Sequence, residues 1–217
     1  MSNISPIDGR YKKNVSELET FFSEQALMRH RVMVEVEYLL ALIEHKSFQK
    51  TRALSKKTLN SLKGLYVEFS ATHFKQIKKI EKKTNHDVNA VVEFLSEKLK
   101  KFGRGDLVPF VHFGLTSEDI NNISYSLMAQ GAVDNVMIPH VKGVLKELKA
   151  LSKKTKSLSL LSLTHGQPAT TTTLGKELAV FVSRVEREIA LIKKMKLLAK
   201  LSGATGSYAA HKVAFPD

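Results

Sequence analysis

Two histidines in polar stretches of the sequence are the side chains best suited to proton transfer. His165 lies in "LTHGQPATTTT" (residues 163–173) and His86 lies in "KTNHDV" (residues 83–88). An imidazole can accept or donate a proton near neutral pH, so each is a candidate general acid or base. Gly166 would let another group approach the backbone closely, and Pro168 would stiffen the chain before a threonine cluster. Taken alone, these residues favour a structural turn before a capped helix, with proton donation by His165 as the alternative.

The second histidine is not explained by helix capping. Thr84, Asn85 and Asp87 can all cap the helix that is expected to follow. The positive end of the helix dipole disfavours an imidazolium at this place, which favours a neutral, hydrogen-bonding ring on His86. Taken alone, the stretch indicates a helix cap with an incidental histidine.

A third polar stretch, "HFGLTSEDINN" (residues 112–122), could bind an anion. Thr116 or Ser117 is a good N-cap, and the hydroxyls and free N–H groups of a helix start can bind a carboxylate or a phosphate. Glu118 and Asp119 would repel that anion unless they point away from it. A well-capped helix without a ligand is the alternative.

Near the N-terminus, "SPIDGRY" (residues 5–11) is typical of a turn, because Gly9 frees the backbone. The guanidinium of Arg10, beside Tyr11, suits a phosphate or a carboxylate, although an ordinary surface arginine also fits.

Helices must position these polar stretches. Apolar residues recur at three- and four-residue steps over residues 18–45, and further helical patterns cover residues 54–83, 87–101, 117–156 and 174–201. Pro139 should kink the fourth of these. Strict alternation is nearly absent, so no sheet is indicated. The sequence therefore predicts an all-α fold, an elongated bundle whose long helices are shared between subunits.

Composition limits the classes of protein. The 217 residues contain no cysteine, which excludes disulfides and thiolate metal sites and fits a reducing, cytoplasmic setting. The first residues lack the pattern of a secretory signal, and no apolar stretch reaches the roughly 18 residues of a membrane helix. We expect a soluble protein with one domain or somewhat more.

The formal net charge of +13 raises the question of polyanion binding. The excess is mostly lysine, in pairs such as residues 56–57, 82–83 and 153–154 along helical patterns. Base readout prefers arginine, and neither zinc-finger spacing nor an aromatic RNA-binding motif is present. The pattern favours solvated helix faces; attraction of a small anionic substrate and nucleic-acid binding are the alternatives.

Taken together, "SPIDGRY", "TNHDV", "TSEDIN" and "THGQPATTTTLGKEL" closely resemble, in this order, the adenylosuccinate lyases of the fumarase/aspartase superfamily. The resemblance runs from about Ser5 to Asp217. The first two segments favour these lyases over fumarase, aspartase and argininosuccinate lyase. The resemblance implies an N-terminal helical domain over residues 1–115 and the first part of a central long-helix bundle over residues 116–217, without the C-terminal domain.

The implied chemistry is a β-elimination that uses no metal or cofactor. Adenylosuccinate would give AMP and fumarate, and succinylaminoimidazole carboxamide ribotide (SAICAR) would give AICAR and fumarate. His165 matches the family's general acid, and His86 matches a second catalytic histidine that also binds substrate. The other matches are to substrate-binding residues, which are Arg10, Tyr11, Asn85, Asp87, Thr116, Ser117, Thr164 and Gln167.

The family's general base is not found in these 217 residues. Its serine lies in a loop of the form G-S-S-x-M-P-x-K-x-N, and "GSYAAHKVAFP" (residues 206–216) lacks the second serine and the Met-Pro, so Ser207 is not assigned as the base. The resemblance also implies a homotetramer with three subunits at each active site, and neither a nucleic-acid nor a membrane partner. We expect an active full-length enzyme and an inactive fragment. The alternatives are another fumarate-releasing lyase, such as argininosuccinate lyase, or a basic helical nucleic-acid-binding protein.

Overall fold

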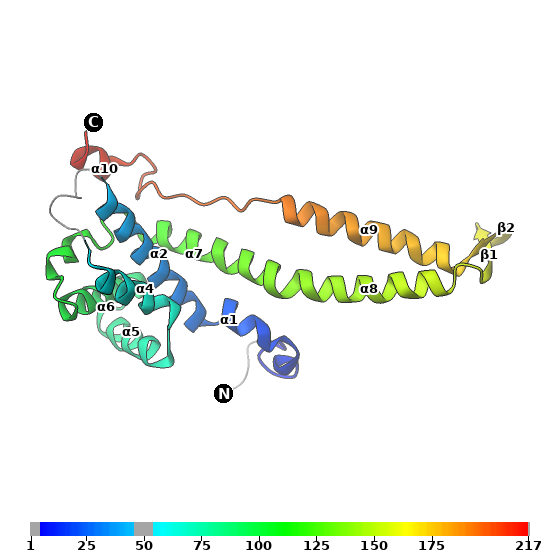
Figure 1. Ribbon diagram of the computed structural model, residues 1–217, viewed down its shortest axis with the longest axis horizontal. Helices are drawn as coiled ribbons and strands as arrows, with labels where there is room; N and C mark the ends of the chain where they lie inside the picture. Colours follow the sequence, from blue (N-terminus) through cyan, green and yellow to red (C-terminus); the bar gives the residue numbers. More distant parts are fainter. Residues whose placement is uncertain (1–4, 46–53, 217) are drawn as a thin grey trace. The chain divides into compact units, whose positions relative to one another are not determined.

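A computed structural model describes residues 5–45 and 54–216 of the chain (Figure 1). The chain forms two compact units, one of Met1–Gln130 with Leu198–Asp217 and the other of Gly131–Leu197. The first unit is thus built from two separated parts of the sequence. The domain boundary after residue 115 stays a prediction, and Asp217, where the family resemblance ends, lies outside the described residues.

Helices form the regular structure described for the first unit. In chain order they are η1 (Lys12–Leu18, a 3-10 helix), α1 (Glu19–Phe22), α2 (Glu24–Glu44), α4 (Lys56–Val67), α5 (Ala71–Thr84), α6 (Asp87–Lys101), η2 (Gly105–Phe110, a 3-10 helix), α7 (Ser117–Ala132) and α10 (Ala209–Ala214). The last residues of α7 run into the second unit. The predicted helix over residues 87–101 is confirmed as α6, and the mostly helical fold is confirmed as well.

Two helices that the apolar periodicity predicts as continuous are each divided by a serine. Ser23 has extended backbone (ψ 159°), and its Oγ accepts the N–H of Ala26 at 3.1 Å, so α2 starts afresh after α1. Ser70 does the same between α4 and α5, where its Oγ accepts the N–H of His73 and its own N–H donates to His73 Nδ1. A serine that caps a helix ends the preceding one because its backbone leaves the helical region. The predictions over residues 18–45 and 54–83 were therefore wrong at these two breaks.

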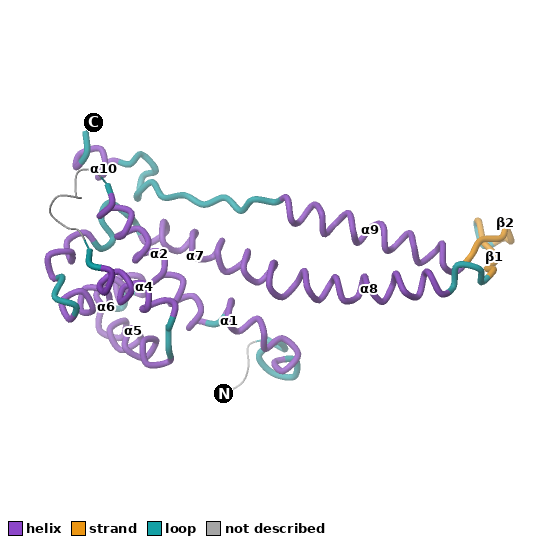
Figure 2. The backbone as a smooth tube through the Cα atoms, viewed as in Figure 1, coloured by secondary structure: helices purple, strands orange, loops and turns teal. Residues whose placement is uncertain are grey.

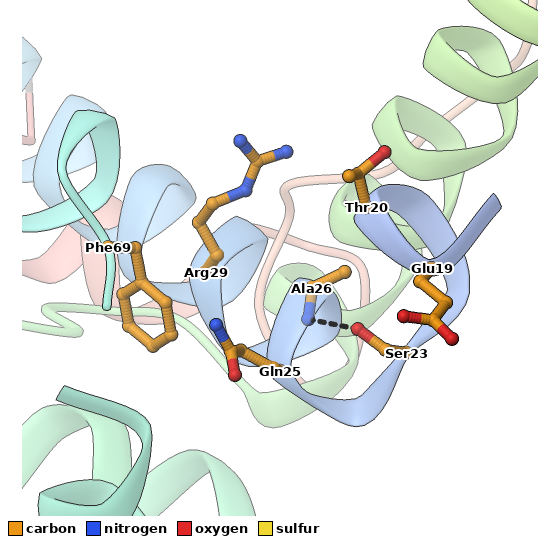
Figure 3. Close-up of a pocket in the computed structure, with 7 residues that line it drawn as sticks. All are labelled: Glu19, Thr20, Ser23, Gln25, Ala26, Arg29 and Phe69. Atoms are coloured by element: carbon orange, nitrogen blue, oxygen red, sulfur yellow. Dashed lines mark hydrogen bonds between the residues drawn. The ribbon is translucent and has the colours of Figure 1, made fainter. Parts of the chain in front are cut away.

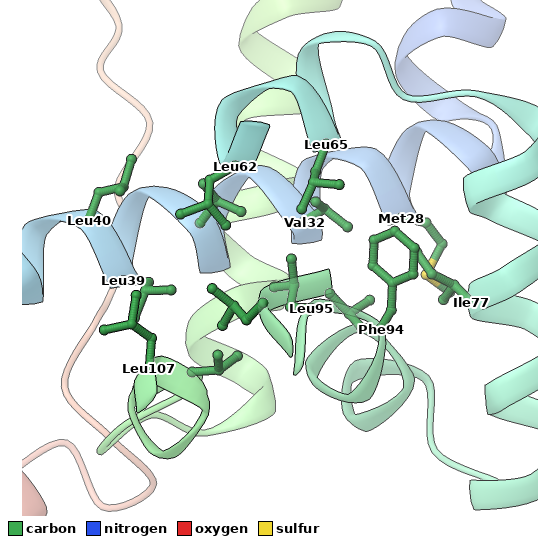
Figure 4. Close-up of a cluster of buried hydrophobic side chains, with 14 of the residues drawn as sticks. Met28, Val32, Leu39, Leu40, Leu62, Leu65, Ile77, Phe94, Leu95 and Leu107 are labelled. Atoms are coloured by element: carbon green, nitrogen blue, oxygen red, sulfur yellow. The ribbon is translucent and has the colours of Figure 1, made fainter. Parts of the chain in front are cut away.

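The core of the first unit is organised around α2 and α6. Met28, Val32, Val36 and Leu39 recur at three- and four-residue steps along α2 and are almost completely buried. Figure 4 shows Met28, Val32 and Leu39 together with Phe94 of α6 and with leucines and an isoleucine from the surrounding helices. The buried apolar surface stabilises these helices by about 25 cal/mol for each Å² that is removed from water. It also holds the first turn of α6 in a defined position relative to α2.

The second unit is a pair of helices with a β-hairpin between them. It contains η3 (Val133–Met137, a π-helix), α8 (Ile138–Lys154), β1 (Ser159–Thr164), β2 (Gln167–Thr173) and α9 (Leu174–Lys194). Leu145 of α8 packs with Val182 and Ile189 of α9, and the two helices lie side by side (Figure 1). No helix among the described residues is both long and apolar enough to cross a membrane.

The predicted helix over residues 117–156 is interrupted near its proline. The π-helical turn η3 lies between α7 and α8 and ends two residues before Pro139. Because proline lacks the N–H that would bond to residue 135, the chain widens locally to a different hydrogen-bond pattern. One turn earlier, Asn135 Nδ2 donates to the carbonyl of Gly131 at 2.8 Å.

The predicted helix over residues 174–201 ends at Lys194. The chain from Leu198 onward belongs to the first unit, where Lys200 N–H donates to Asn122 Oδ1 (2.8 Å) and the Lys200 carbonyl accepts from Asn122 Nδ2 (3.0 Å). These bonds to a side chain replace the bonds that a continued helix would make.

A two-stranded antiparallel hairpin, β1–β2, lies where no sheet was predicted (Figure 2). Its register pairs Ser159 with Thr173 and Thr164 with Gln167, with an irregularity between Leu161 and Leu163. The strands are short and lack strict alternation, so the sequence pattern does not reveal them. Thr173 ends β2 and caps α9, because its Oγ1 accepts the N–H of Lys176 at 3.2 Å. The predicted threonine cap is confirmed.

The returning chain segment is anchored by one buried carboxylate. Asp119 is completely buried. It accepts hydrogen bonds from Lys200 Nζ at 2.6 Å and from the N–H groups of Thr116, Ser202 and Gly203 at 2.9 to 3.1 Å. Burial alone raises the pKa of Asp119, but the hydrogen bonds from Lys200 and from the backbone outweigh it, so the pKa is below its ordinary value.

Gly175→Ala tests the contact between α8 and α9. A Cβ at Gly175 would lie 2.5 Å from the carbonyl oxygen of Ser152 and 2.6 Å from Lys156 Cα, both backbone atoms. We expect a loss of about 1–3 kcal/mol in the free energy of unfolding, measured by urea denaturation. Gly143→Ala is the matched control, because nothing lies within 4 Å of its Cβ position; it should stabilise the protein by up to about 1 kcal/mol. Equal effects of the two substitutions would contradict the close helix contact.

Asp119→Asn tests the anchor of the returning segment. We expect a loss of about 2 kcal/mol at pH 7, because charge-assisted hydrogen bonds become neutral ones. The folded-state pKa lies below the unfolded value of about 3.9, so this stability is present above pH 4 and is lost as the pH falls through the folded pKa. The wild type and the variant should thus converge in acid denaturation series between about pH 5 and pH 2. Glu118→Gln, the same change on an exposed neighbour, is the control; a difference that persists at the lowest pH would refute this account.

Candidate functional site

The first turn of α6 is capped by the imidazole of His86. Its Nδ1 accepts the N–H of Asn89 at 3.1 Å, and its carbonyl accepts the N–H of Ala90. The expectation that capping would leave His86 unexplained was therefore wrong. An accepting Nδ1 assigns the ring proton to Nε2 in the neutral tautomer, so Asp87 Oδ1, 3.7 Å from Nδ1, is not an ion-pair partner in this form. Half of the His86 side chain is exposed, which leaves Nε2–H available to a ligand.

Asp87 is held by an ion pair to a buried arginine. Its Oδ2 lies 2.6 Å from Arg31 Nη2, and its Oδ1 accepts the N–H of Val88. Burial alone raises the pKa of Asp87, but the Arg31 guanidinium and the Val88 N–H outweigh it, so the pKa is lowered. Asp87 is thus a carboxylate whose orientation is fixed within the protein.

Asn85 completes this segment. It ends α5 in the left-handed conformation (φ 51°), which asparagine tolerates better than most residues. With His86 and Asp87 it lines a hollow of about 540 Å³, whose other wall is formed by Lys78, Glu81 and Lys82. The structure therefore brings together the three candidates from "TNHDV" on one surface hollow.

The start of α7 carries two hydroxyl residues followed by one exposed and one buried acid. Asp119 accepts the N–H of Thr116 and faces residues 200–203 in the interior, whereas Glu118 is exposed. Thr116 and Ser117 are both partly exposed. Asp119 is engaged within the protein, but it occupies the N–H of Thr116, and the condition that both Glu118 and Asp119 point away from a bound anion stays a prediction.

The starts of α6 and α7 lie next to each other. Val88 of α6 and Ile120 of α7 are buried together against Val34 of α2. Arg31, which pairs with Asp87, also donates from Nε to Asn121 Oδ1 at 2.9 Å. Two of the four polar stretches thus share one place in the first unit, which sequence spacing alone does not reveal.

The tip of the β1–β2 hairpin is formed by His165 and Gly166. Both have positive φ, 51° and 73°, between the paired residues Thr164 and Gln167. Two successive positive φ angles are typical of a type I′ turn, which matches the twist of the flanking strands. The imidazole is exposed at this tip, as are Thr164 and Gln167. Nothing lies within 4 Å of a Cβ at Gly166, so the turn itself requires glycine here.

Arg10 and Tyr11 lie in the N-terminal turn of the first unit. The Arg10 guanidinium stacks over the Tyr11 ring, 5.6 Å from its centroid, and Tyr11 precedes η1. Among the contacts of residues 5–45 and 54–216 that the structure defines, none joins this pair to the other candidates. The three candidates on the hairpin belong to the second unit and the rest to the first.

A buried polar cluster was missed in the sequence. Glu35 is completely buried, its Oε1 lies 2.6 Å from His112 Nδ1, and its Oε2 has no partner among the described residues. Nearby, Tyr38 Oη lies 2.7 Å from both the Phe113 carbonyl and His211 Nε2. Burial, followed by the charges of Glu35 and Asp119, raises the pKa of Tyr38 to about 12. An acidic residue within the apolar stripe of α2 was the available signal.

The cluster places an oriented imidazole four residues before Thr116. A carboxylate that hydrogen-bonds one ring nitrogen fixes the orientation of the ring. His112 also has a positive φ of 60°, so its backbone and its side chain are both constrained.

A separate pocket of about 320 Å³ lies where α1 meets α2 (Figure 3). Its lining residues are Glu19, Thr20, Ser23, Gln25, Ala26, Arg29 and Phe69. None of the candidate residues from the four polar stretches lines it, so we do not assign it to the site.

Solved structures with the same fold include two enzymes of low sequence identity. A fumarate lyase from Mesorhizobium sp. BNC1 superposes with a TM-score of 0.69 at 21% identity, over 90% of this chain and 44% of that one. A β-carboxy-cis,cis-muconate cycloisomerase from Acinetobacter calcoaceticus superposes with a TM-score of 0.68 at 22% identity, over 91% and 45% of the two chains. These structures establish the fold.

Curated relatives are more similar in sequence. Adenylosuccinate lyase from Escherichia coli K12 is 40% identical over the whole of this chain and 48% of its own length, and that from Dictyostelium discoideum is 42% identical over the whole of this chain and 47% of its own. The chain therefore spans about half the length of the curated relatives it matches. Residues 9–216 match the protein family described as Lyase. The chain belongs to this lyase family and is a homologue of adenylosuccinate lyase.

Proposed function

We propose that this chain supplies the general acid and part of the substrate site of an adenylosuccinate lyase of purine and AMP biosynthesis, located in the cytoplasm. The enzyme would split adenylosuccinate into AMP and fumarate, and SAICAR into AICAR and fumarate. The observation that carries the proposal is the adjacency of the α6 and α7 starts, the two helix ends beside which His86 and the Thr116–Ser117 pair lie in the sequence. Identity of about 40% to adenylosuccinate lyases along the whole chain supports it.

The elimination makes two demands on the protein. A base removes a proton from the carbon beside a succinyl carboxylate, and the electron pair of that C–H bond becomes the new C=C bond as the C–N bond breaks. The negative charge that develops next to the carboxylate is stabilised by hydrogen-bond donors around it, the role we assign to Thr116 and Ser117. The departing nitrogen must receive a proton, the role we assign to His165.

The remaining candidates would hold the nucleotide. Arg10, stacked on Tyr11, offers a planar fork of donors that suits the phosphate. His86 would donate from Nε2–H, and Asn85 and Asp87 would flank it on the same hollow. Thr164 and Gln167 would contact the substrate beside His165. None of these roles requires a metal or a cofactor.

The hairpin also supports an assembly in which another subunit covers it. Leu158, Leu160, Leu161 and Leu163 are all exposed around the strand that leads to His165. Exposed leucines in one place are typical of a surface that another chain covers. We propose that this surface is buried in a homotetramer whose active sites combine segments from three subunits, so that His165 donates its proton in an enclosed site.

His165→Ala tests the general acid in a polypeptide that contains this chain together with a G-S-S-x-M-P-x-K-x-N loop. We expect kcat/KM for adenylosuccinate to fall about 10²- to 10⁴-fold, measured by the change in absorbance on cleavage. His140→Ala, an exposed histidine on α8, is the matched control and should keep near-normal turnover. Near-normal turnover of His165→Ala would instead remove His165 from the mechanism, and salt-sensitive nucleic-acid binding would then favour a basic binding protein.

The 217-residue chain by itself should not cleave adenylosuccinate. The reason is chemical, because the serine that we expect to act as the base lies in a loop that these residues do not contain. The measurement is the same absorbance assay at high protein concentration, with argininosuccinate as a second substrate to separate the related lyases. Turnover by the chain alone would mean that the base lies within it.

A further inference from the structure

Arg31 is a buried arginine whose contacts lead to two helix starts. It lies on α2, where only 2% of it is exposed. Its Nη2 lies 2.6 Å from Asp87 Oδ2 at the start of α6, and its Nε donates to Asn121 Oδ1 at 2.9 Å in the second turn of α7. The remaining nitrogen, Nη1, lies 3.7 Å from Met28 Sδ on its own helix. The Arg31 guanidinium on α2 thus contacts both the start of α6 and the start of α7.

The starts of α6 and α7 both carry candidate substrate-binding residues. Asn85, His86 and Asp87 precede or begin α6, and Thr116 and Ser117 begin α7. The apolar contact of Val88 and Ile120 with Val34 brings these two helix starts together but does not fix their rotation. Hydrogen bonds at defined angles can fix the rotation, because they weaken steeply when misaligned.

The shape of arginine explains why this position is not a lysine. A guanidinium offers donors in a rigid planar fork, so it can bond two acceptors in different directions, whereas an ammonium is a single point of charge. Burying the fork is unfavourable unless the charge is paired and its donors are satisfied. Here the partly exposed carboxylate of Asp87 pairs with the Arg31 charge, and Asn121 Oδ1 accepts a hydrogen bond from Arg31 Nε.

We propose that Arg31 is a positioning residue that sets the geometry of the α6 and α7 starts, so that His86 and the Thr116–Ser117 pair contact the same substrate. The inference rests on the proposed function for its substrate. Arg31 acts through Asp87 and Asn121 and does not itself touch the reacting atoms. A displacement of the two segments by about 1 Å would reduce the efficiency of the reaction by on the order of a hundredfold.

Arg31→Lys is the decisive variant, because it keeps the charge and removes the fork. In the polypeptide that carries the base loop, we expect kcat/KM to fall about 10- to 100-fold, with KM raised at least several-fold because both segments bind substrate. Asn121→Ala, which removes only the bond to α7, should lower kcat/KM about three- to tenfold. Arg29→Lys, the same change two residues away on α2, is the control and should leave both constants unchanged. A merely structural role of Arg31 predicts less folded enzyme, and so a lower apparent kcat with an unchanged KM.

Hydrogen exchange provides a readout that does not depend on activity. In Arg31→Lys the amides of Val88–Ala90 and of residues 119–122 should exchange faster than in Arg29→Lys, while those of α8 should not change. Faster exchange with a raised KM supports the proposal. Unchanged exchange at both helix starts, or faster exchange with an unchanged KM, overturns it. If the wild type does not cleave adenylosuccinate, the proposed function fails, and exchange alone decides whether Arg31 holds the two starts together.

Discussion

The buried carboxylate of Asp119 is the interaction on which the first unit depends. It satisfies the N–H of Thr116 at the start of α7 and holds residues 200–203, far away in the sequence, through a lysine and two backbone N–H groups. The Asn122 side chain and Tyr38 add hydrogen bonds to the same returning segment, at Lys200 and His211. The same carboxylate accepts the N–H of Thr116, so the anchor of the fold also caps the helix start that carries Thr116 and Ser117.

The candidate site residues lie on separate parts of the chain. The α6 and α7 starts meet in the first unit, Arg10 and Tyr11 lie in the N-terminal turn, and His165 lies on the hairpin of the second unit. Each part is held by its own local structure: a ring-nitrogen cap at His86, a stacked pair at Arg10, and a tight turn at His165.

Many of the helices and one helix cap could be predicted from the sequence. The features that were missed share a cause. Periodicity predicted α6 with its correct bounds, and the threonine cluster predicted the cap at Thr173. The breaks at Ser23 and Ser70 were missed because a capping serine hardly disturbs the apolar pattern around it. The hairpin was missed because its strands do not alternate, and the roles of Arg31, Glu35 and His112 were missed because they depend on partners tens of residues away. Local patterns predict elements; contacts between elements need the folded structure.

The left-handed backbone at position 165 places an unusual restriction on how this position can evolve. Of the residue types that tolerate such a conformation, asparagine, aspartate and histidine are the most enriched, and glycine adopts it freely. Only histidine among them combines this tolerance with a proton that exchanges readily near neutral pH. The turn alone restricts the choice to a few residue types, and the need for such a proton restricts it further to histidine. If His165 acts as the acid, proton transfer and the left-handed backbone at the hairpin tip both favour histidine, for independent reasons.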